Sequence, residues 1–335
     1  MQVDYLTALK VFQQLPDEQK SPYLHPYYVC LDATRDQSLE PVFFVYTEEG
    51  KIFYYPFHIA GVPGTEFFDI QAPYAYGGPI SSSHDPRFLS RAGSQYLSWC
   101  QAKNILAEFV RFHPLLANWR YYPGELQDMR ETVWIDLQRE ELFPSYTARV
   151  RTAIRKAQKN NLRIEWVQTS DYFQAFAEFY TQAMDCLQAE PFYYFSREYF
   201  QKLQYWQHSY LAICWKDEST VAAALFLKEA HIMEYHLSAA NSNGKRFNAS
   251  NLIIHQAAIK ARQLNCRALC LGGGTDNRSN NSLLFFKAGF SKQRACFRIG
   301  KIIHAPEAYK RMQEDWRAVY GRCNDKVLFY RFAGG

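Results

Sequence analysis

The sequence predicts an α+β protein built from two tandem units of similar plan. In each half, strand-like runs form a meander, a helix follows, and a further strand comes after the helix. The length agrees, because 335 residues suit one large domain or two ordinary ones. Hydrophobic residues make up 48% of the chain and aromatic residues 17%, so a sizeable core with ring-lined clefts is expected.

The first half shows strand-like runs separated by turn residues, with one helical segment. In that segment Phe88, Leu89, Ala92 and Tyr96 fall on one side at helical spacing. The predicted strands are 26–34, 41–50, 51–62, 67–74 and 105–112, and the predicted helix is 86–104.

The second half repeats this order and extends it by a short helix and a last strand. A break in pattern at 137–146, which holds several charges and Pro144, is the predicted seam between the halves. The predicted helices are 171–187, 249–265 and 282–289, and the predicted strands are 209–219, 220–230, 231–240, 267–273 and 290–300.

Composition excludes some classes of protein. A net charge of +5 permits an anionic partner without requiring one. The eight cysteines include no CxxC pair, and no histidine pair lies near Cys266 and Cys270 at zinc spacing, so no metal site is expected. The N-terminal region has no apolar run of signal length, and no window approaches a membrane span. We therefore expect a cytoplasmic protein with reduced thiols.

Three glycines follow a short apolar run in "LGGGTDNRSNNSLLFFKAGFS", residues 271–291. The spacing does not fit the Walker pattern, and a dinucleotide fingerprint lacks its third glycine. One interpretation is a wide turn at a strand edge. The other is that Gly273 and Gly274 let a substrate approach the backbone closely.

A basic helix is predicted at 149–159. Its apolar positions fall on one side and its cations on the other. Arg151 and Arg155 are candidates to bind phosphates of a nucleotide-sugar acceptor or of tRNA, and a solvated helix face is the alternative. The cationic side consists of Arg149, Arg151, Arg155, Lys156 and Lys159.

The motif "YAYGGP" places two tyrosines before two glycines. It is either a simple turn or a cleft wall that grips an acceptor through tyrosine hydroxyls and exposed backbone. The candidate substrate-binding residues here are Tyr74, Tyr76, Gly77 and Gly78.

Two further stretches carry polar candidates. Arg111 and His113 share one side near the end of a predicted strand, which suits anion or carbohydrate binding or a satisfied structural pair. Tyr194, in "FYYF", lines a cleft or belongs to the core. In the predicted strand 231–240, alternation places Glu234, His236 and Ser238 on one face and Met233, Tyr235 and Leu237 on the other.

The segment "LFFKAGF" (284–290) resembles the signature near the end of GNAT acyltransferases, where a short helix precedes a strand. The order of elements in the second half is also similar. Two differences stand out. The loop 241–250 has one glycine, Gly244, where CoA-dependent members have a glycine-rich pyrophosphate loop. Phe285 stands where a tyrosine commonly protonates the departing thiolate.

With these differences and its doubled plan, the chain resembles the FemABX-type branch of GNAT-fold proteins. That branch includes aminoacyl-tRNA-dependent transferases that build peptidoglycan cross-bridges, and relatives in cell-surface polysaccharide clusters. The similar segments are 72–80, 108–119, 149–165, 190–203, 234–241 and 271–291.

The resemblance implies two GNAT-like domains, each a mixed and mostly antiparallel sheet flanked by helices. The first would be 1–143 with about 305–335, on the acceptor side, and the second 144–304, with the transfer site. The segment 326–332 would be a closing strand that returns to the first domain.

The resemblance also implies an N-acyltransferase that moves an acyl or aminoacyl group onto an amine of a cell-wall peptide or nucleotide-linked amino sugar. Transfer would be direct, in a ternary complex. Phe286 and Lys287 would lie beside the reacting carbonyl, where the lysine supports developing negative charge; a lysine snorkelling from a surface helix is the alternative. Glu234 or His236 would be the general base, unless the histidine is simply hydrogen-bonded in the sheet. Tyr235 would contact substrate.

The implied co-substrate is aminoacyl-tRNA or acyl-CoA, with no permanently bound cofactor. The implied partners are a nucleotide-sugar or peptidoglycan-precursor acceptor and tRNA, but not DNA, and a peripheral membrane contact is compatible with the sequence. Two alternatives stay open: an acetyl-CoA-dependent N-acetyltransferase of surface-polysaccharide synthesis, and a catalytically silent module that binds precursors.

Overall fold

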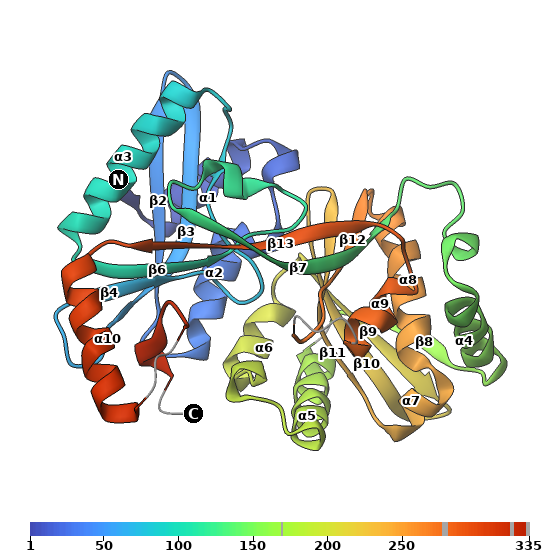
Figure 1. Ribbon diagram of the computed structural model, residues 1–335. Coiled ribbons are helices and arrows are strands. Elements are labelled where there is room, and N and C mark those ends of the chain that lie inside the picture. The colour runs from blue at the N-terminus through green and yellow to red at the C-terminus, as the bar shows by residue number, and fades with distance from the viewer. Residues whose placement is uncertain (169, 277–280, 322–324, 333–335) are drawn as a thin grey trace. The chain divides into compact units, whose positions relative to one another are not determined.

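The computed structural model describes residues 1–168, 170–276, 281–321 and 325–332. The chain forms two compact units: unit 1 comprises 1–129 with 297–335, and unit 2 comprises 130–296 (Figure 1). The chain passes between them within β7 (Glu125–Asp136) and β13 (Arg294–Ile303). The predicted domain limits near 143 and 304 differ from the unit limits and stay a prediction.

Unit 1 contains a sheet in the order β1-β2-β3-β4-β6-β13, with β5 paired to β3. One face is covered by α3, whose buried side chains join an aromatic core. Its elements are β1 (Gln2–Val3), α1 (Tyr5–Gln14), α2 (Pro26–Asp32), β2 (Glu40–Glu48), β3 (Lys51–Gly61), β4 (Phe68–Gln71), β5 (Ile80–Ser81), α3 (Pro86–Ala102), β6 (Ile105–Arg111) and α10 (Pro306–Tyr320), with 3-10 turns at Asp17–Gln19, Pro22–Leu24, Ala33–Arg35, Asn118–Tyr121 and Phe329–Arg331.

Unit 2 contains a sheet in the order β7-β12-β11-β10-β9-β8. The helices α4 and α8 bury their apolar sides in one core against this sheet. Its elements are α4 (Ala148–Lys159), β8 (Arg163–Val167), α5 (Ser170–Leu187), α6 (Arg197–Gln204), β9 (Ser209–Lys216), β10 (Ser219–Glu229), β11 (Ile232–Ala240), α7 (Ser242–Phe247), α8 (Ala249–Gln263), β12 (Ala268–Gly272) and α9 (Ser282–Ala288), with 3-10 turns at Phe143–Ser145 and Pro191–Tyr193.

The two units share one plan, so the predicted α+β class with a tandem arrangement is confirmed. Unit 1 has the antiparallel meander β2-β3-β4, then α3, then β6 parallel to β4. Unit 2 has β9-β10-β11, then α8, then β12 parallel to β11. In sequence, β7 follows β6, but its part 133–136 pairs with β12 in unit 2. Likewise β13 follows β12, but its part 299–303 pairs with β6 in unit 1. The halves therefore exchange their last strands.

The predicted strand 26–34 is wrong, because this segment begins with the helix α2. The side chain of His25 caps the helix by accepting a hydrogen bond from the Tyr27 amide at 3.0 Å, and Pro26 occupies the first helical position. Its buried side chains include Tyr28 and Val29. The aromatic and β-branched residues that suggested a strand therefore pack on one side of a helix.

The predicted closing strand 326–332 is also wrong. Phe329–Arg331 is a 3-10 turn, and Phe329 is buried in unit 1. Arg331 forms an ion pair with buried Asp69 at 2.6 Å. Side chains, rather than strand pairing, attach this segment to the unit. Among the described helices, none is both long and apolar enough to cross a bilayer.

Candidate active site

The parallel pair of β11 and β12 forms the centre of the candidate site in unit 2. Their register ends with Glu234 opposite Cys270. Beyond this pair, β12 shifts register against β7 and reaches Gly272, which has a positive φ of 72°. Side chains opposite each other in a parallel pair lie on the same face, so Glu234 and Cys270 are neighbours there.

Lys287, on α9, is buried and points to the end of β12. Its Nζ donates a hydrogen bond to the Gly273 carbonyl at 2.8 Å. Burial lowers the pKa of Lys287 to about 8; the nearby Cys270 acts to raise this pKa, and the Arg130 charge lowers it further. Asn281 caps the start of this helix, because its side chain accepts a hydrogen bond from the Leu284 amide at 3.0 Å.

Glu234, Cys270 and Lys287 therefore form one buried cluster. Burial, followed by the Glu234 carboxylate, raises the pKa of the Cys270 thiol, while Lys287 acts to lower it. The Cys270 thiol, which neighbours Glu234 and Lys287, therefore stays protonated at physiological pH. Two predicted catalytic residues, Glu234 and Lys287, lie in this cluster. Cys270 and Arg130 were not predicted, although Cys270 follows from the strand register once the pairing of β11 and β12 is known.

The predicted glycines lie beside this cluster. A Cβ atom on Gly273 would lie 3.2 Å from the Glu131 carbonyl and 3.4 Å from the Arg130 Nε. A Cβ atom on Gly274 would collide with the Asn281 side chain. These glycines let β7 and the start of α9 approach the turn closely, and a role in substrate binding stays a prediction.

Phe286 and Lys287 point in different directions from α9. Phe286 packs against the core of unit 2 and makes an edge contact with Phe290 at 5.6 Å between ring centroids. Phe285 is 65% exposed, and the Arg149 guanidinium lies over its ring at 4.3 Å. The lysine is buried and does not snorkel from the surface as the alternative interpretation required.

A β-bulge places His236. Phe226 of β10 is opposite Tyr235 and Leu225 is opposite Leu237, so His236 is the extra residue between them. Its Nε2 lies 2.7 Å from the hydroxyl of the buried Tyr199 on α6. This contact matches the hydrogen-bonded histidine of the alternative interpretation, and a role as base stays a prediction.

The same bulge changes the faces of the residues that follow. Ser238 is paired with Ala224, a member of the core that Tyr235 also contacts, so Ser238 lies on the Tyr235 side. The predicted faces of Leu237 and Ser238 are wrong for this reason. Burial raises the pKa of Tyr235 to about 12, so this phenol is neutral at physiological pH.

The loop 241–250 contains the short helix α7. Its Gly244 amide donates to the Asn241 side chain at 2.9 Å. A Cβ atom on Gly244 would collide with the Val221 carbonyl of β10. This glycine is required for packing, and its amide already serves the helix cap.

Three further predicted residues of unit 2 make local contacts. Arg151 donates to the Pro144 carbonyl at 3.1 Å and also to the Tyr146 carbonyl. Arg155 lies over the Phe143 ring at 5.3 Å. Tyr194 donates to the Asp185 carboxylate at 2.9 Å. Their roles in substrate binding stay predictions.

In unit 1, Arg111 organises the loop 72–79. Its guanidinium donates to the carbonyls of Ala72 at 3.3 Å, Pro73 at 2.9 Å and Ala75 at 3.1 Å. The Arg111 carbonyl in turn accepts from the Gly77 amide at 2.7 Å. These contacts fit the structural alternative for Arg111, and anion binding stays a prediction.

The remaining predicted residues of unit 1 belong to the same loop or contact it. Tyr76 makes an edge contact with the buried His113 at 5.2 Å between centroids. Gly78 has a positive φ of 97° and lies against Phe112, so only glycine suits this position. The Tyr74 amide donates to Asp32 at 2.8 Å. The predicted residues of unit 1 thus lie together around this loop.

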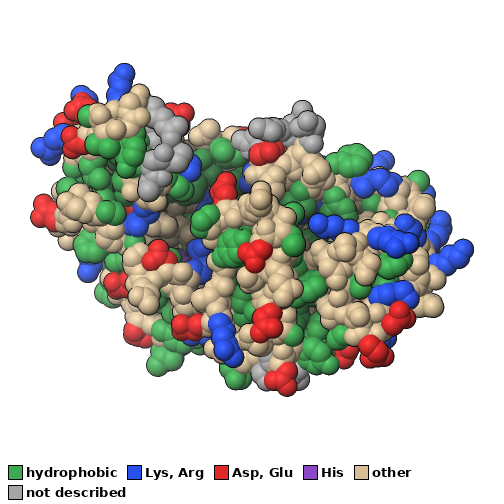
Figure 2. Space-filling view, turned by 90° about the horizontal axis from the view of Figure 1, so that it is seen from below, with side chains coloured by type: hydrophobic (Ala, Val, Ile, Leu, Met, Phe, Trp, Pro, Cys, Tyr) green, Lys and Arg blue, Asp and Glu red, His purple; other side chains and the backbone are tan. Residues whose placement is uncertain are grey.

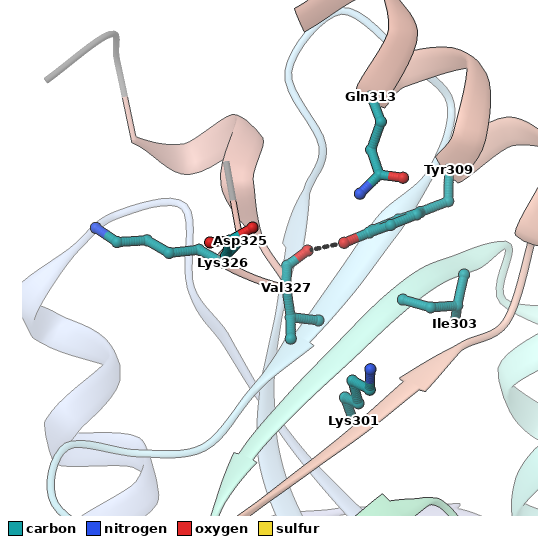
Figure 3. A pocket seen from close by; sticks show the side chains of 7 residues that line it. All are labelled: Lys301, Ile303, Tyr309, Gln313, Asp325, Lys326 and Val327. Carbon is teal, nitrogen blue, oxygen red and sulfur yellow. Dashed lines mark hydrogen bonds between the residues drawn. The ribbon is translucent and has the colours of Figure 1, made fainter. Parts of the chain in front are cut away.

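A pocket of about 300 Å³ lies elsewhere in unit 1 (Figure 3). Its walls come from β13, α10 and the C-terminal segment, and Lys301 in it also pairs with Glu125 at 3.1 Å. It contains no predicted site residue. The lining residues are Lys301, Ile303, Tyr309, Gln313, Asp325, Lys326 and Val327.

Residues 144–287 match the family model described as the acetyltransferase (GNAT) domain. No protein with a curated function matches the sequence. The chain is similar to solved structures at low identity. The crystal structure of FemX has a TM-score of 0.72 and 11% identity, and the match covers 93% of this chain and 99% of FemX.

Two further solved structures share the fold as well. The C-terminal domain of a putative lysylphosphatidylglycerol synthetase from Agrobacterium fabrum has a TM-score of 0.62 and 13% identity, covering 94% of this chain and 97% of that domain. L-PGS from Bacillus licheniformis has a TM-score of 0.60 and 12% identity, covering 89% and 92%. At these identities the structural matches establish the fold. The match of residues 144–287 to the GNAT domain supports an acyltransferase, and the fold of the chain is the one seen in FemX.

Proposed function

We propose that this protein transfers an acyl or aminoacyl group directly onto an amine of a cell-wall peptide or a nucleotide-linked amino sugar. The observation that carries this proposal is the buried ammonium of Lys287 at the end of β12. It is held by the Gly273 carbonyl and is near Cys270, which in turn neighbours Glu234. A cation is rarely buried without a specific purpose, because desolvation disfavours it.

In the proposed reaction, the acceptor amine attacks the carbonyl carbon of an ester or thioester donor. The new C–N bond forms, and the carbonyl electron pair moves onto oxygen. Collapse of this intermediate breaks the bond to the leaving alcohol or thiol, which takes a proton as it departs. A cation in a poorly hydrated site stabilises the oxyanion far better than one in water.

Lys287 is suited to hold that oxyanion. In the described part of the chain, its Nζ donates to the Gly273 carbonyl, and an ammonium has three N–H donors. The two others would serve the oxyanion. With a pKa of about 8, most Lys287 side chains are charged at pH 7.

The amine must also lose a proton, and Glu234 and His236 are the proposed bases. Glu234 lies in the Lys287 cluster through its neighbour Cys270. His236 lies two residues along β11 and is fixed by Tyr199. The substitutions Glu234→Gln and His236→Gln distinguish the two. Loss of the true base removes the rise of the rate with pH on the acidic side of the pH–rate profile.

For the donor, we favour aminoacyl-tRNA. The fold is shared with FemX and with a lysylphosphatidylglycerol synthetase, whose name specifies a lysyl group joined to a lipid. The Gly244 amide is occupied by Asn241, which argues against a pyrophosphate cradle in this loop. Phe285 has no proton for a departing thiolate. Acyl-CoA is the second candidate, favoured by the match to the GNAT acetyltransferase domain.

The loop 72–79 of unit 1, whose backbone is held by Arg111, stays a candidate for acceptor binding through Tyr74 and Tyr76. One structural relative is named as a lysylphosphatidylglycerol synthetase, so a lipid hydroxyl is a further acceptor to test. Transfer to nucleotide-linked amines, peptide amines and the hydroxyl of phosphatidylglycerol would be compared with one charged donor.

The test of the function is Lys287→Met, with Lys287→Arg as the control that keeps the charge. We expect Lys287→Met to lower turnover about 10²–10³-fold with acceptor affinity nearly unchanged. Full activity of Lys287→Met would remove this residue from the mechanism. Calorimetric titration with acetyl-CoA separates the donors, since acyl-CoA transfer requires binding. Tight precursor binding without transfer from any donor would instead identify a silent binding module.

A further inference from the structure

Three helices of unit 2, α4, α7 and α8, lack acidic residues. They hold five, two and two lysines and arginines, respectively, and no aspartate or glutamate. All three pack against one another. By contrast, α5 holds three acidic residues and no lysine or arginine. Positive charge is therefore concentrated on one group of helices.

The exposed cations of α4 and α7 form a surface that we call the basic helical face. On α4 the three cations follow the spacing of one helix side, opposite the buried Val150, Ile154 and Ala157. Figure 2 shows lysine and arginine side chains gathered on the right, the side on which Figure 1 draws these helices. The face consists of Arg155, Lys156, Lys159, Lys245 and Arg246.

Arginines bordering this face use their guanidinium groups on backbone carbonyls. Arg149 donates to Phe285, Arg151 to Pro144 and Tyr146, and Arg262 to Leu137, Arg139 and Glu140. Bidentate arginine forks are the groups that grip individual phosphates, whereas lysines act as point charges. The two arginines of the face, Arg155 and Arg246, lie over the rings of Phe143 and Phe247. The face therefore suits a diffuse anionic surface better than site-specific phosphate recognition.

An exposed aromatic ring lies at the border of this face. Phe285 is 65% exposed, and Arg149 of α4 stacks on it at 4.3 Å. Exposed aromatic rings beside cations are typical of segments that lie in the headgroup region of a bilayer. Bases of single-stranded RNA also stack on such rings, so RNA is the competing partner that a test must separate.

We propose that the basic helical face and Phe285 dock this protein on an anionic lipid surface. The lysines and arginines would attract acidic headgroups, and the phenylalanine would enter the interface. The proposal does not rest on the transfer reaction, because docking is measured without donor or acceptor. Failure of the docking proposal would therefore not affect the transfer proposal, and the reverse also holds.

The experiment is co-flotation of the full chain with vesicles of phosphatidylcholine alone or mixed with phosphatidylglycerol. We expect binding to the mixed vesicles, weakening as salt rises. The triple variant Lys156→Glu, Lys159→Glu, Lys245→Glu should lower the partition coefficient by at least about 100-fold, since each cation contributes several-fold. Phe285→Ala should weaken binding while its salt dependence persists.

The matched control is Lys310→Glu, Arg311→Glu, Arg317→Glu, the same charge change on exposed positions of α10, a helix that also carries acidic residues. It should bind like the wild type. Equal binding to neutral and mixed vesicles, salt-independent binding by the wild type, or equal losses in both triple variants would overturn the proposal. So would a triple variant that loses binding to bulk tRNA but keeps its binding to vesicles.

Discussion

The two units repeat one strand plan but end it differently. In unit 1 the chain that leaves β4 stays beside β6: the Ala72 amide donates to Phe109 at 3.2 Å, and Gly77 bridges to Phe112. In unit 2 the corresponding pairing of β11 with β12 ends at Glu234 and Cys270. In unit 1 the loop therefore continues the pairing beyond β4. In unit 2 the Gly273 carbonyl, just after β12, instead accepts a hydrogen bond from Lys287.

The two units also differ in the surroundings of their buried charged groups. In unit 1, buried Glu108 accepts from the Tyr55 hydroxyl and from the Tyr96 hydroxyl at 2.7 Å, and His304 lies 3.2 Å away. In unit 2, burial shifts the pKa of Lys287 well below that of a free lysine.

A buried lysine with a lowered pKa is a candidate site of chemistry. Burial also shifts the pKa of Asp69 and of Arg111 in unit 1, but Asp69 serves an ion pair with Arg331 and Arg111 holds a loop. We therefore propose that transfer takes place in unit 2.

The largest expected effect on stability comes from Glu108→Ala. The change leaves buried tyrosine hydroxyls without their acceptor, so we expect the free energy of unfolding to fall by about 3–5 kcal/mol in denaturant titrations. The control is Glu125→Ala, which removes an exposed partner of Lys301 and should change it by less than about 0.5 kcal/mol. Similar small effects of both substitutions would contradict the stabilising role of Glu108 in unit 1.

Lys287→Met should instead raise the free energy of unfolding at neutral pH. The folded pKa of Lys287 is about 8 and the ordinary value 10.5, so the folded state disfavours the proton that the unfolded state keeps. Between these pH values the unfolded state binds more protons, so stability rises with pH. Below pH 8 the charge costs about 3 kcal/mol, which the methionine avoids.

Unfolding of wild type and Lys287→Met at pH 7 and pH 10 measures this difference. The variant should be more stable at pH 7, and its advantage should shrink toward pH 10. The catalytic rate should fall above pH 8 as Lys287 loses its proton. A variant less stable than the wild type at pH 7 would show that the lysine is a structural group like Glu108.

The smallest expected effect tests the closure of unit 1. Arg111→Lys retains the charge but loses the planar fork that holds three carbonyls of the loop 72–79. We expect a loss of about 1–2 kcal/mol and faster hydrogen exchange at the Gly77 amide. Unchanged exchange there would mean that strand pairing alone closes this loop.

Sequence patterns predicted most of the fold because apolar runs of strand length are separated by turn residues in both meanders. They failed at 26–34, where a histidine cap and Pro26 turn a strand-like composition into a helix. They also missed β7, whose segment 125–131 is largely exposed and rich in charge, so that its alternation is hidden. The exchange of β7 and β13 depends on pairing between distant segments, which local pattern does not encode.

The site was predicted in part for the same reason. Lys287 and Glu234 were both predicted from the family resemblance, and alternation along the strand gave only the face of Glu234. Cys270 and Arg130 required the register of β12 with its two neighbours, β11 and β7. Their proximity to Lys287 is a product of tertiary pairing, so no spacing in the sequence indicates it.

The exchange of last strands makes the two halves of the chain mutually dependent. A fragment that ends near 143 would leave β6 without β13, and the complementary fragment would leave β12 without β7. Each would expose an unpaired strand edge, which favours aggregation. Although each half repeats one plan, separate synthesis of the halves is expected to yield insoluble pieces. Folding of this protein is therefore an interlocking process, in which neither sheet is complete until the whole chain is present.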